Sequence, residues 1–217
     1  MTTTTLTIPT YEHITRLSTD ISQKDHYKLL IGCVVPRPIA FVSTCSPDGV
    51  TNIAPFSFFN AVASNPPSIV FSVTRRGSDG EKKDTLKNIE STGEFVVSVV
   101  TEHNVVLANQ ASAEYSSDHS EFAATGLTPL SSTIVKPPRL AQSPVNMECK
   151  LLQLVPVGDG SLGSSTLVIG EIVCYHLAPE MVHDGRMDIA QLKPVSRLAG
   201  SAYAPVRDIF ELPRPLI

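Results

Sequence analysis

Residues 36–44, "PRPIAFVST", read as a β-strand with two unusual ends. The apolar centre, residues 39–42, is preceded by Arg37 between two prolines and followed by Ser43 and Thr44. Proline has no N–H group to complete a ladder of hydrogen bonds, and it holds the preceding residue in an extended conformation. The stretch therefore predicts a strand with a partly free edge, a positioned arginine and two hydroxyls that face something other than solvent.

Four further stretches alternate apolar and polar residues with a period of two, which is typical of half-buried strands. They are "PSIVFSVT" (67–74), "EFVVSVV" (94–100), "NMECKLLQLVPV" (146–157) and "TLVIGEIVCYHL" (166–177). Gly170 inside the last stretch indicates a bulge or a close approach of another group. These patterns make strands the dominant element.

Turn signals separate these strands at short spacing. "SPDGV" (46–50) predicts a tight hairpin turn, and "GDGSLGSS" (158–165) predicts a flexible hairpin loop. Helices are expected to be few: "DTLKNIESTG" (84–93), which ends in a glycine cap, and "EHNVVLANQASA" (102–113). Short strands joined by such turns predict a closed antiparallel barrel, with the proline-rich segment from Leu192 wrapped over it.

Composition excludes several classes of function. The chain has 217 residues, 42% of them hydrophobic, and a formal net charge of −4 without a basic stripe, so we expect no nucleic-acid partner. No apolar run approaches the roughly 18 residues of a membrane span, and the first residues lack the pattern of a secretory signal. The four cysteines and six histidines show no zinc-site spacing, so we expect free thiols, no metal site and a cytoplasmic location.

Two stretches suggest parts of a binding site. "TNIAPFSFFNAV" (51–62) places Asn52, Ser57 and Asn60 among apolar side chains, as a pocket for a flat apolar ligand with a polar rim would. The same pattern also fits a phenylalanine-rich core strand whose polar residues face solvent. "EKKDTLKN" (81–88) puts two lysines before a helix start with Asp84 or Thr85 as the N-cap, which predicts an anion site, although such caps are also common beside lysines.

Together these stretches describe a ligand with a planar ring system and a phosphate. Flavin mononucleotide (FMN) has both parts. The dinucleotide fingerprint, a GxGxxG string that follows a strand and opens a helix, is absent: the string GDGSLG (158–163) lies in the predicted hairpin loop between two strands. A GxxxxGK[ST] phosphate loop is absent as well. A flavin would therefore be held by a barrel.

The stretch "YKLLIGCVVPRPIAFVSTCSPDGVTNIAPFSFFNAVASNPP" (27–67), with "KKDTLKNIESTGEFVVSVV" (82–100) after it, closely resembles the flavin reductase-like family, which includes flavoredoxins. "VNMECKL", "LVIGEIV" and "LKPVSRLAGSAYA" continue the likeness more loosely. The resemblance implies a mainly β, FMN-binding split barrel of Greek-key type with a few short helices, and a homodimer with FMN near the subunit interface. We expect the domain to span residues 25–205, after a loose leader (1–24) and before a tail (206–217).

The resemblance also implies which residues bind FMN. Three groups are expected near the ring, the ribityl chain and the phosphate, and a fourth, around "RLAGSAY", near the ligand. They are Arg37, Pro38, Ile39, Ala40, Ser43 and Thr44; Asn52, Ala54, Pro55, Ser57, Phe59 and Asn60; Lys83, Asp84 and Thr85; and Arg197 and Tyr203.

Redox chemistry in such a protein belongs to the flavin, so we expect no catalytic acid, base or nucleophile. The first hypothesis is an NAD(P)H-dependent flavin reductase. The second is a flavoredoxin-type electron carrier reduced by a redox protein. A third is a barrel that binds a flat ligand without redox turnover. The motifs report flavin binding and leave the electron donor open.

Overall fold

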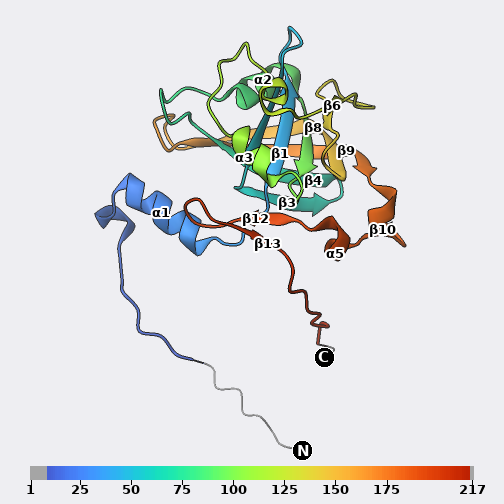
Figure 1. Ribbon diagram of the computed structural model, residues 1–217. Helices are drawn as coiled ribbons and strands as arrows, with labels where there is room; N and C mark the ends of the chain where they lie inside the picture. The colour runs from blue at the N-terminus through green and yellow to red at the C-terminus, as the bar shows by residue number, and fades with distance from the viewer. Residues whose placement is uncertain (1–8, 216–217) are drawn as a thin grey trace, which may run out of the picture.

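The computed structural model describes residues 9–215 and shows a mainly β protein built on one antiparallel sheet (Figure 1). Seven strands form this sheet in the order β2-β1-β5-β8-β9-β4-β3. Their bounds are β1 Ala40–Cys45, β2 Thr51–Phe56, β3 Phe59–Ser64, β4 Pro67–Thr74, β5 Glu94–Val99, β8 Val145–Val157 and β9 Ser165–Leu177. Within residues 9–215, no helix is long and apolar enough to cross a membrane.

The alternating stretches of the sequence form β4, β5, β8 and β9, as predicted. The predicted turn at 46–50 joins β1 to β2, and Gly49 adopts a φ of 89° there. Gly170 is confirmed as a point of close approach, because a Cβ atom added to it would lie 2.3 Å from Cζ of Phe95. The β8–β9 register also shifts beside it, between Leu151 and Gln153.

The sheet curls because its two edge strands follow each other in the chain. β2 ends at Phe56 and β3 begins at Phe59, so the chain crosses from one edge to the other through Ser57 and Phe58. A flat sheet of this size would hold its edges roughly 29 Å apart, at about 4.8 Å per strand, which this link cannot span. The result is a barrel that is split between β2 and β3, which confirms the predicted fold class.

Strand β1 is buried on both faces, which explains the uninterrupted apolar run of the opening stretch. Ala40 and Val42 face the barrel interior, in a cluster that includes Phe71. Ile39 and Phe41 face a second cluster outside the sheet, against the following helices and loops.

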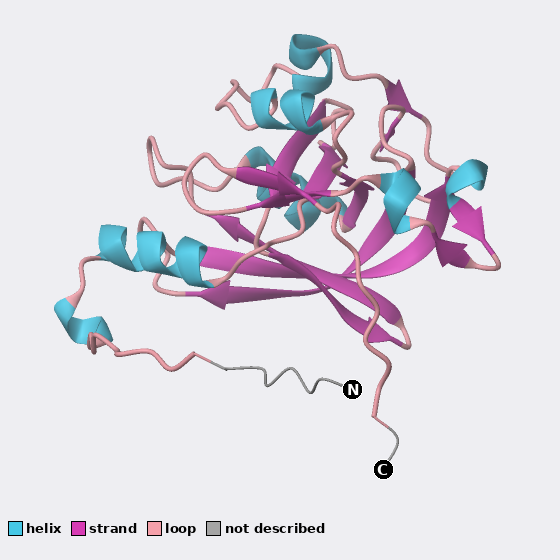
Figure 2. Cartoon of the chain, turned by 60° about the horizontal axis from the view of Figure 1, so that its bottom comes forward, coloured by secondary structure: helices cyan, strands magenta, loops and turns pink. Residues whose placement is uncertain are grey.

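The helices are short and lie around the sheet (Figure 2). The predicted helix at 84–93 is confirmed, with Gly93 as a left-handed C-cap at a φ of 69°, whereas the one at 102–113 is reduced to α3. The bounds are η1 Ser18–Asp20, α1 Gln23–Cys33, α2 Asp84–Thr92, α3 Val105–Gln110, α4 Glu121–Thr125, η2 Pro179–Met181 and α5 Ile189–Leu192.

Three two-stranded ribbons complete the fold: β6 Pro129–Leu130 with β7 Arg139–Leu140, β10 Val182–His183 with β11 Arg186–Met187, and β12 Val195–Arg197 with β13 Tyr203–Pro205. The β12–β13 ribbon is tied to the barrel by backbone bridges between Arg37 and Arg197 and between Thr101 and Pro194. The segment from Leu192 to Pro205 therefore lies on the barrel, as predicted, whereas residues 208–215 are exposed and extend away from it (Figure 1).

Candidate functional site

A groove runs along β2 beside the split in the barrel. It consists of two hollows, of about 70 and 200 Å³, that share Pro55 and Ser112. The first is lined by Asn52, Ala54, Pro55, Arg76, Lys83, Asp84, Thr85, Ala111, Ser112, Ala113, Glu114, Tyr115 and Glu121. The second is lined by Tyr27, Ile39, Pro55, Ser57, Ala108, Asn109, Ser112, Arg197 and Tyr203. We call these the cationic end and the aromatic end of the groove.

The start of α2 forms one wall of the cationic end. The prediction that Asp84 or Thr85 is the N-cap was wrong. The N-cap residue is Lys83, and its side chain makes no capping hydrogen bond to the backbone of the first turn. The hydroxyl of Thr85 donates instead to Oδ1 of Asn52 at 2.8 Å, and the carboxylate of Asp84 pairs with Lys87 at 3.1 Å. The first N–H groups of the helix therefore keep their capacity to bind an anion in the groove.

Asn52 is held in place by the protein around it. Its Nδ2 donates to Glu121 at 2.8 Å, and its Oδ1 accepts from both Thr85 and Thr44. Glu121 also accepts the backbone N–H of Ile53 at 3.0 Å. Burial raises the pKa of the Glu121 carboxyl above its ordinary value. Asn52 thus joins β1, β2, α2 and α4 at the floor of the groove.

Arg76 adds a second positive charge to the cationic end. Its Nε is buried without a hydrogen-bond partner, although Oδ1 of Asp79 lies 3.6 Å away. Its Nη2 donates to the carbonyl of Lys82 at 3.3 Å. A buried N–H group that lacks a partner in the protein is suited to a ligand acceptor in the groove.

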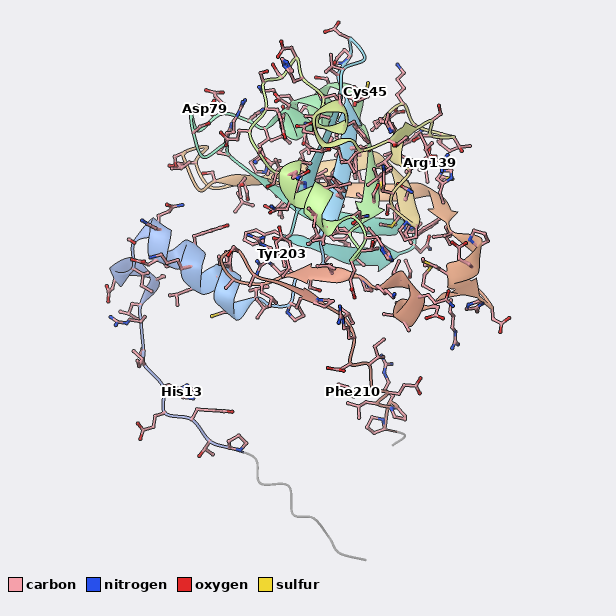
Figure 3. All side chains as sticks on the ribbon, in the orientation of Figure 1. His13, Cys45, Asp79, Arg139, Tyr203 and Phe210 are labelled. Carbon is pink, nitrogen blue, oxygen red and sulfur yellow. The ribbon has the colours of Figure 1, made fainter. Side chains whose placement is uncertain are left out.

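The aromatic end is shaped by the β12–β13 ribbon (Figure 3). The guanidinium carbon of Arg197 lies 4.3 Å from the centre of the Tyr203 ring, and the Tyr203 hydroxyl donates to Asn109 at 3.0 Å. Ile39 supplies an apolar wall, and Ser57 comes from the link between the two edge strands. The arrangement combines apolar and aromatic side chains with hydroxyl, amide and guanidinium groups, a mixture that can hold a planar ligand with polar edges.

Arg37 contacts the groove through Ser57. Its buried guanidinium donates to the carbonyls of Ile31, Val34 and Leu198, and its Nε donates to Ser57 at 3.3 Å. The side chain therefore joins the end of α1 to the β12–β13 ribbon behind Ser57. Arg37 is positioned rather than solvated, as the prolines predicted.

The remaining predicted residues lie around the groove rather than on its wall. Ala40, Ser43 and Thr44 are completely buried in β1, where Ser43 donates to the Pro138 carbonyl and Thr44 to Asn52. Phe59 packs against the interior cluster. Pro38 and Asn60 are exposed, and Asn60 accepts the N–H of Ala61.

The sequence reasoning missed several residues of the groove: Tyr27, Arg76, Ala108, Asn109, Ala111–Tyr115 and Glu121. Arg76 had a readable signal, because "RRG" directly follows β4 and precedes the lysines of the predicted anion site. The other residues come from α1 and from the connection after β5, where the sequence shows no periodic pattern.

Comparison with known proteins identifies the family. Residues 31–190 match the family described as "Flavin reductase like domain". Nitrilotriacetate monooxygenase component B from Bacillus cereus superposes with a TM-score of 0.89 and 39% identity, over 94% of this chain and 100% of that one. 2-Nitrobenzoate 2-nitroreductase from Pseudomonas fluorescens superposes with a TM-score of 0.83 and 30% identity, over 94% of this chain and 96% of that one. Flavoredoxin of Desulfovibrio vulgaris superposes with a TM-score of 0.70 and 26% identity, over 82% of this chain and 91% of that one.

The family match covers most of the chain, and the similar structures share the same arrangement of strands. A flavin-related oxidoreductase function follows from this match, with a flavin as the cofactor. The chain therefore belongs to the flavin reductase-like family.

Proposed function

We propose that this protein binds FMN in the groove and transfers hydride from NAD(P)H to flavin. The observation that carries the proposal is the polarity of the groove. One end combines Lys83, Arg76 and the uncapped start of α2, and the other combines the Arg197–Tyr203 pair with Ile39 and Pro55. A phosphate fits the first end and a planar ring the second.

The cationic end fits a phosphate on three counts. The helix start offers N–H groups, Lys83 offers a charge, and the buried Nε of Arg76 lacks a partner that a phosphate oxygen would supply. Three carboxylates line the same hollow but are engaged: Asp84 with Lys87, Glu114 with the N–H of Gly77, and Glu121 with Asn52 and the N–H of Ile53. Lys83, the helix start and the Nε of Arg76 are thus the groups best placed to meet an anion.

The protein's contribution to the reaction is position and environment. A bound flavin supplies the hydride and electron transfer. Ile39 and Pro55 would contact the ring of a bound flavin, and Ser57 and Asn109 would supply hydrogen-bonding groups to its edge. Tyr203, held by Asn109 and by Arg197, closes the outer side of this end.

The electron donor separates two candidate functions. A nicotinamide donor makes the protein a flavin reductase. A redox-protein donor makes it an electron carrier, which the likeness to a flavoredoxin favours. Anaerobic mixing of the FMN-loaded protein with NADH or NADPH distinguishes them. Rapid bleaching of the flavin absorbance supports the reductase, whereas bleaching only by a reduced redox protein supports the carrier.

FMN binding is tested by titration with a matched pair of variants. Lys83→Ala removes a charge from the groove and should weaken FMN binding by about 5- to 150-fold, as expected for roughly 1–3 kcal/mol of a charge-assisted hydrogen bond. Lys82→Ala removes the neighbouring charge, which pairs with Glu90 at 2.7 Å outside the lining of the hollow, and should change binding little. Riboflavin should bind more weakly than FMN to the natural chain. Equal effects of both variants, or equal affinities for both flavins, would reject the phosphate site.

We further propose that two copies associate and that the protein works in the cytoplasm. Large apolar side chains are exposed on α1 and β3, among them Leu29, Leu30 and Val62, and the four cysteines are free thiols. We keep residues 25–205 as the domain, with 1–24 and 206–217 as its extensions; the predicted leader lies in part outside the described residues. The mass in solution from light scattering tests the dimer, and a monomer at all concentrations would refute it.

A further inference from the structure

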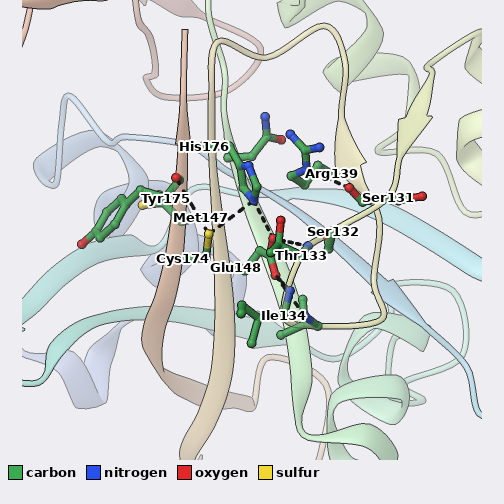
Figure 4. A network of polar contacts seen from close by, with 12 residues as sticks. Ser131, Ser132, Thr133, Ile134, Arg139, Met147, Glu148, Cys174, Tyr175 and His176 are labelled. Carbon is green, nitrogen blue, oxygen red and sulfur yellow. Dashed lines mark hydrogen bonds and ion pairs between the residues drawn. The ribbon is translucent and has the colours of Figure 1, made fainter. Parts of the chain in front are cut away.

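A second cluster of reactive side chains lies on the β8–β9 ribbon and shares no residue with the groove. Glu148 of β8 stands opposite Cys174 of β9, and His176 follows two positions later on the same face of β9 (Figure 4). Their side-chain oxygen, sulfur and nitrogen atoms all lie within 4.8 Å of one another. We propose that Glu148, Cys174 and His176 form a Zn²⁺ site, with water as a fourth ligand.

A bulge in β9 creates this cluster. The register pairs Cys149 with Ile172 but Glu148 with Cys174, so Val173 is an extra residue in β9. Without the bulge, Val173 would stand opposite Glu148, and Cys174 and His176 would turn to the other face of the strand. The bulge therefore exchanges an apolar neighbour of Glu148 for two metal-ligating side chains.

The placement of Cys174 and Glu148 around a single ring nitrogen of His176 fits a shared metal ion better than a proton relay. In a thiol–imidazole–carboxylate relay, one ring nitrogen faces the thiol and the other faces the carboxylate. Here the same Nε2 of His176 faces both groups, at 3.5 Å from Sγ of Cys174 and 2.5 Å from Oε1 of Glu148. Tetrahedral zinc, with bonds of about 2.3 Å to sulfur and 2.05 Å to nitrogen, separates these two ligands by about 3.6 Å.

The nitrogen–oxygen pair must open slightly to admit the ion. Two zinc ligands of this kind lie about 3.3 Å apart, so the His176 ring must move by less than about 1 Å from its present hydrogen bond to Glu148. His176 is half-buried and borders a cavity of about 420 Å³ that is also lined by His103. This cavity gives the ring room to move.

Glu148 is prepared as an anionic ligand. It is completely buried, and its carboxylate accepts the backbone N–H groups of Thr133, Ile134 and Val135 at 2.7, 2.6 and 2.9 Å. Burial by itself would raise the pKa of Glu148, but these hydrogen bonds and the one from His176 together lower it to about 2. The carboxylate is therefore charged at neutral pH, and the backbone groups around it fix its orientation, as metal sites require.

The ligand set selects the metal. One thiolate, one imidazole and one carboxylate form a mixed set that suits zinc, whereas magnesium and calcium prefer oxygen ligands alone. Three protein ligands and one open position are typical of zinc sites that keep a bound water. Zinc would be bound by Cys174 as its thiolate, the form in which cysteine is a metal ligand.

Calorimetric titration of the chelator-treated full-length protein with zinc chloride tests the proposal. The natural chain should bind about one zinc ion, and X-ray absorption should show one sulfur at about 2.3 Å with nitrogen and oxygen at about 2.0–2.1 Å. His176→Gln should weaken binding at least about tenfold, and Cys174→Ser should remove the sulfur contribution. Cys33→Ser, at an exposed thiol, should behave as the natural chain.

These variants change half-buried ligands and leave the buried Glu148 in place, so folding can be verified independently by circular dichroism. The proposal is overturned if the folded natural chain takes up no zinc. It is also overturned if zinc bound to the Cys174→Ser variant keeps its sulfur ligand, or if Cys33→Ser loses it.

Discussion

Replacing Glu148 with glutamine should destabilise the protein strongly and in a pH-dependent way. Oε1 accepts hydrogen bonds from Thr133 and His176, and Oε2 accepts from Ile134 and Val135. Glutamine has one oxygen and one NH₂ group, so its NH₂ group would face two backbone or ring donors. Hydrogen bonds to a charged group contribute about 1.5–3 kcal/mol each, and buried donors left unpaired cost about as much. A loss of about 3 kcal/mol at pH 7 is therefore expected from the contacts.

The pKa of Glu148 gives a similar value for this loss of unfolding free energy. Folding lowers it from 4.5 to about 2, and a difference of about 2.5 units corresponds to about 3.4 kcal/mol. Because the folded pKa lies below the unfolded one, this contribution is complete above about pH 4.5 and disappears as the pH falls toward about 2. The difference in unfolding free energy between the natural chain and Glu148→Gln should fall to about 1.5 kcal/mol at pH 3.

Urea unfolding from pH 7 to pH 3, in the presence of a chelator, measures this difference. Glu94→Gln is the matched control, because Glu94 lies half-buried on the neighbouring strand β5 and accepts one backbone N–H, that of Lys136, at 2.9 Å. Glu94→Gln should lower the free energy of unfolding by about 1 kcal/mol or less. Equal stability of Glu148→Gln and the natural chain at pH 7 would refute the reasoning. A large difference that is the same at every pH would show that lost packing, not charge, is responsible.

Three further substitutions test the fold. Gly170→Ala should lower the free energy of unfolding by about 1–3 kcal/mol, because the new Cβ would overlap the fully buried Phe95 ring. In urea unfolding, adding Phe95→Leu to the same chain should recover part of this loss. A Gly170→Ala variant as stable as the natural chain would contradict the prediction. Gly93→Ala should cost about 1 kcal/mol, since its φ of 69° is left-handed, and a thermal melt unchanged by the substitution would show that the cap is unimportant. Arg37→Lys should lower the free energy of unfolding by about 2 kcal/mol and expose α1 to limited proteolysis, because lysine cannot donate to the same four oxygens. If α1 stays protected in this variant, these hydrogen bonds do not hold α1 in place.

The strands were predictable where their side chains alternate. In β4 and β5 every second side chain enters the interior cluster, so the sequence carries a period of two although the other face is largely buried as well. The helix at 84–93 was predictable from its glycine cap, but its N-cap was not. Asp84 and Thr85 are good capping residues in isolation, yet in the fold their side chains contact Lys87 and Asn52.

The groove was predictable only in part. The three stretches singled out in the sequence do meet in it, through Ile39, Asn52 and Lys83. Arg76 and the segment 111–115 reach it from connections that carry no periodic pattern, so their position depends on tertiary structure. The proximity of Glu148 and His176 was not predictable either, because it depends on a one-residue bulge in β9 that has no signal in the local sequence.

The short connection through Ser57 and Phe58 sets a limit on how far the barrel can open. From Phe56 to Phe59 the chain can reach at most about 11 Å, so the gap between the outermost strands has a fixed maximum width near this point. The groove is bounded differently, because its walls opposite Ser57 come from α3 and from the β12–β13 ribbon. Insertions in those outer segments can therefore admit a bulkier guest while the barrel itself keeps its dimensions.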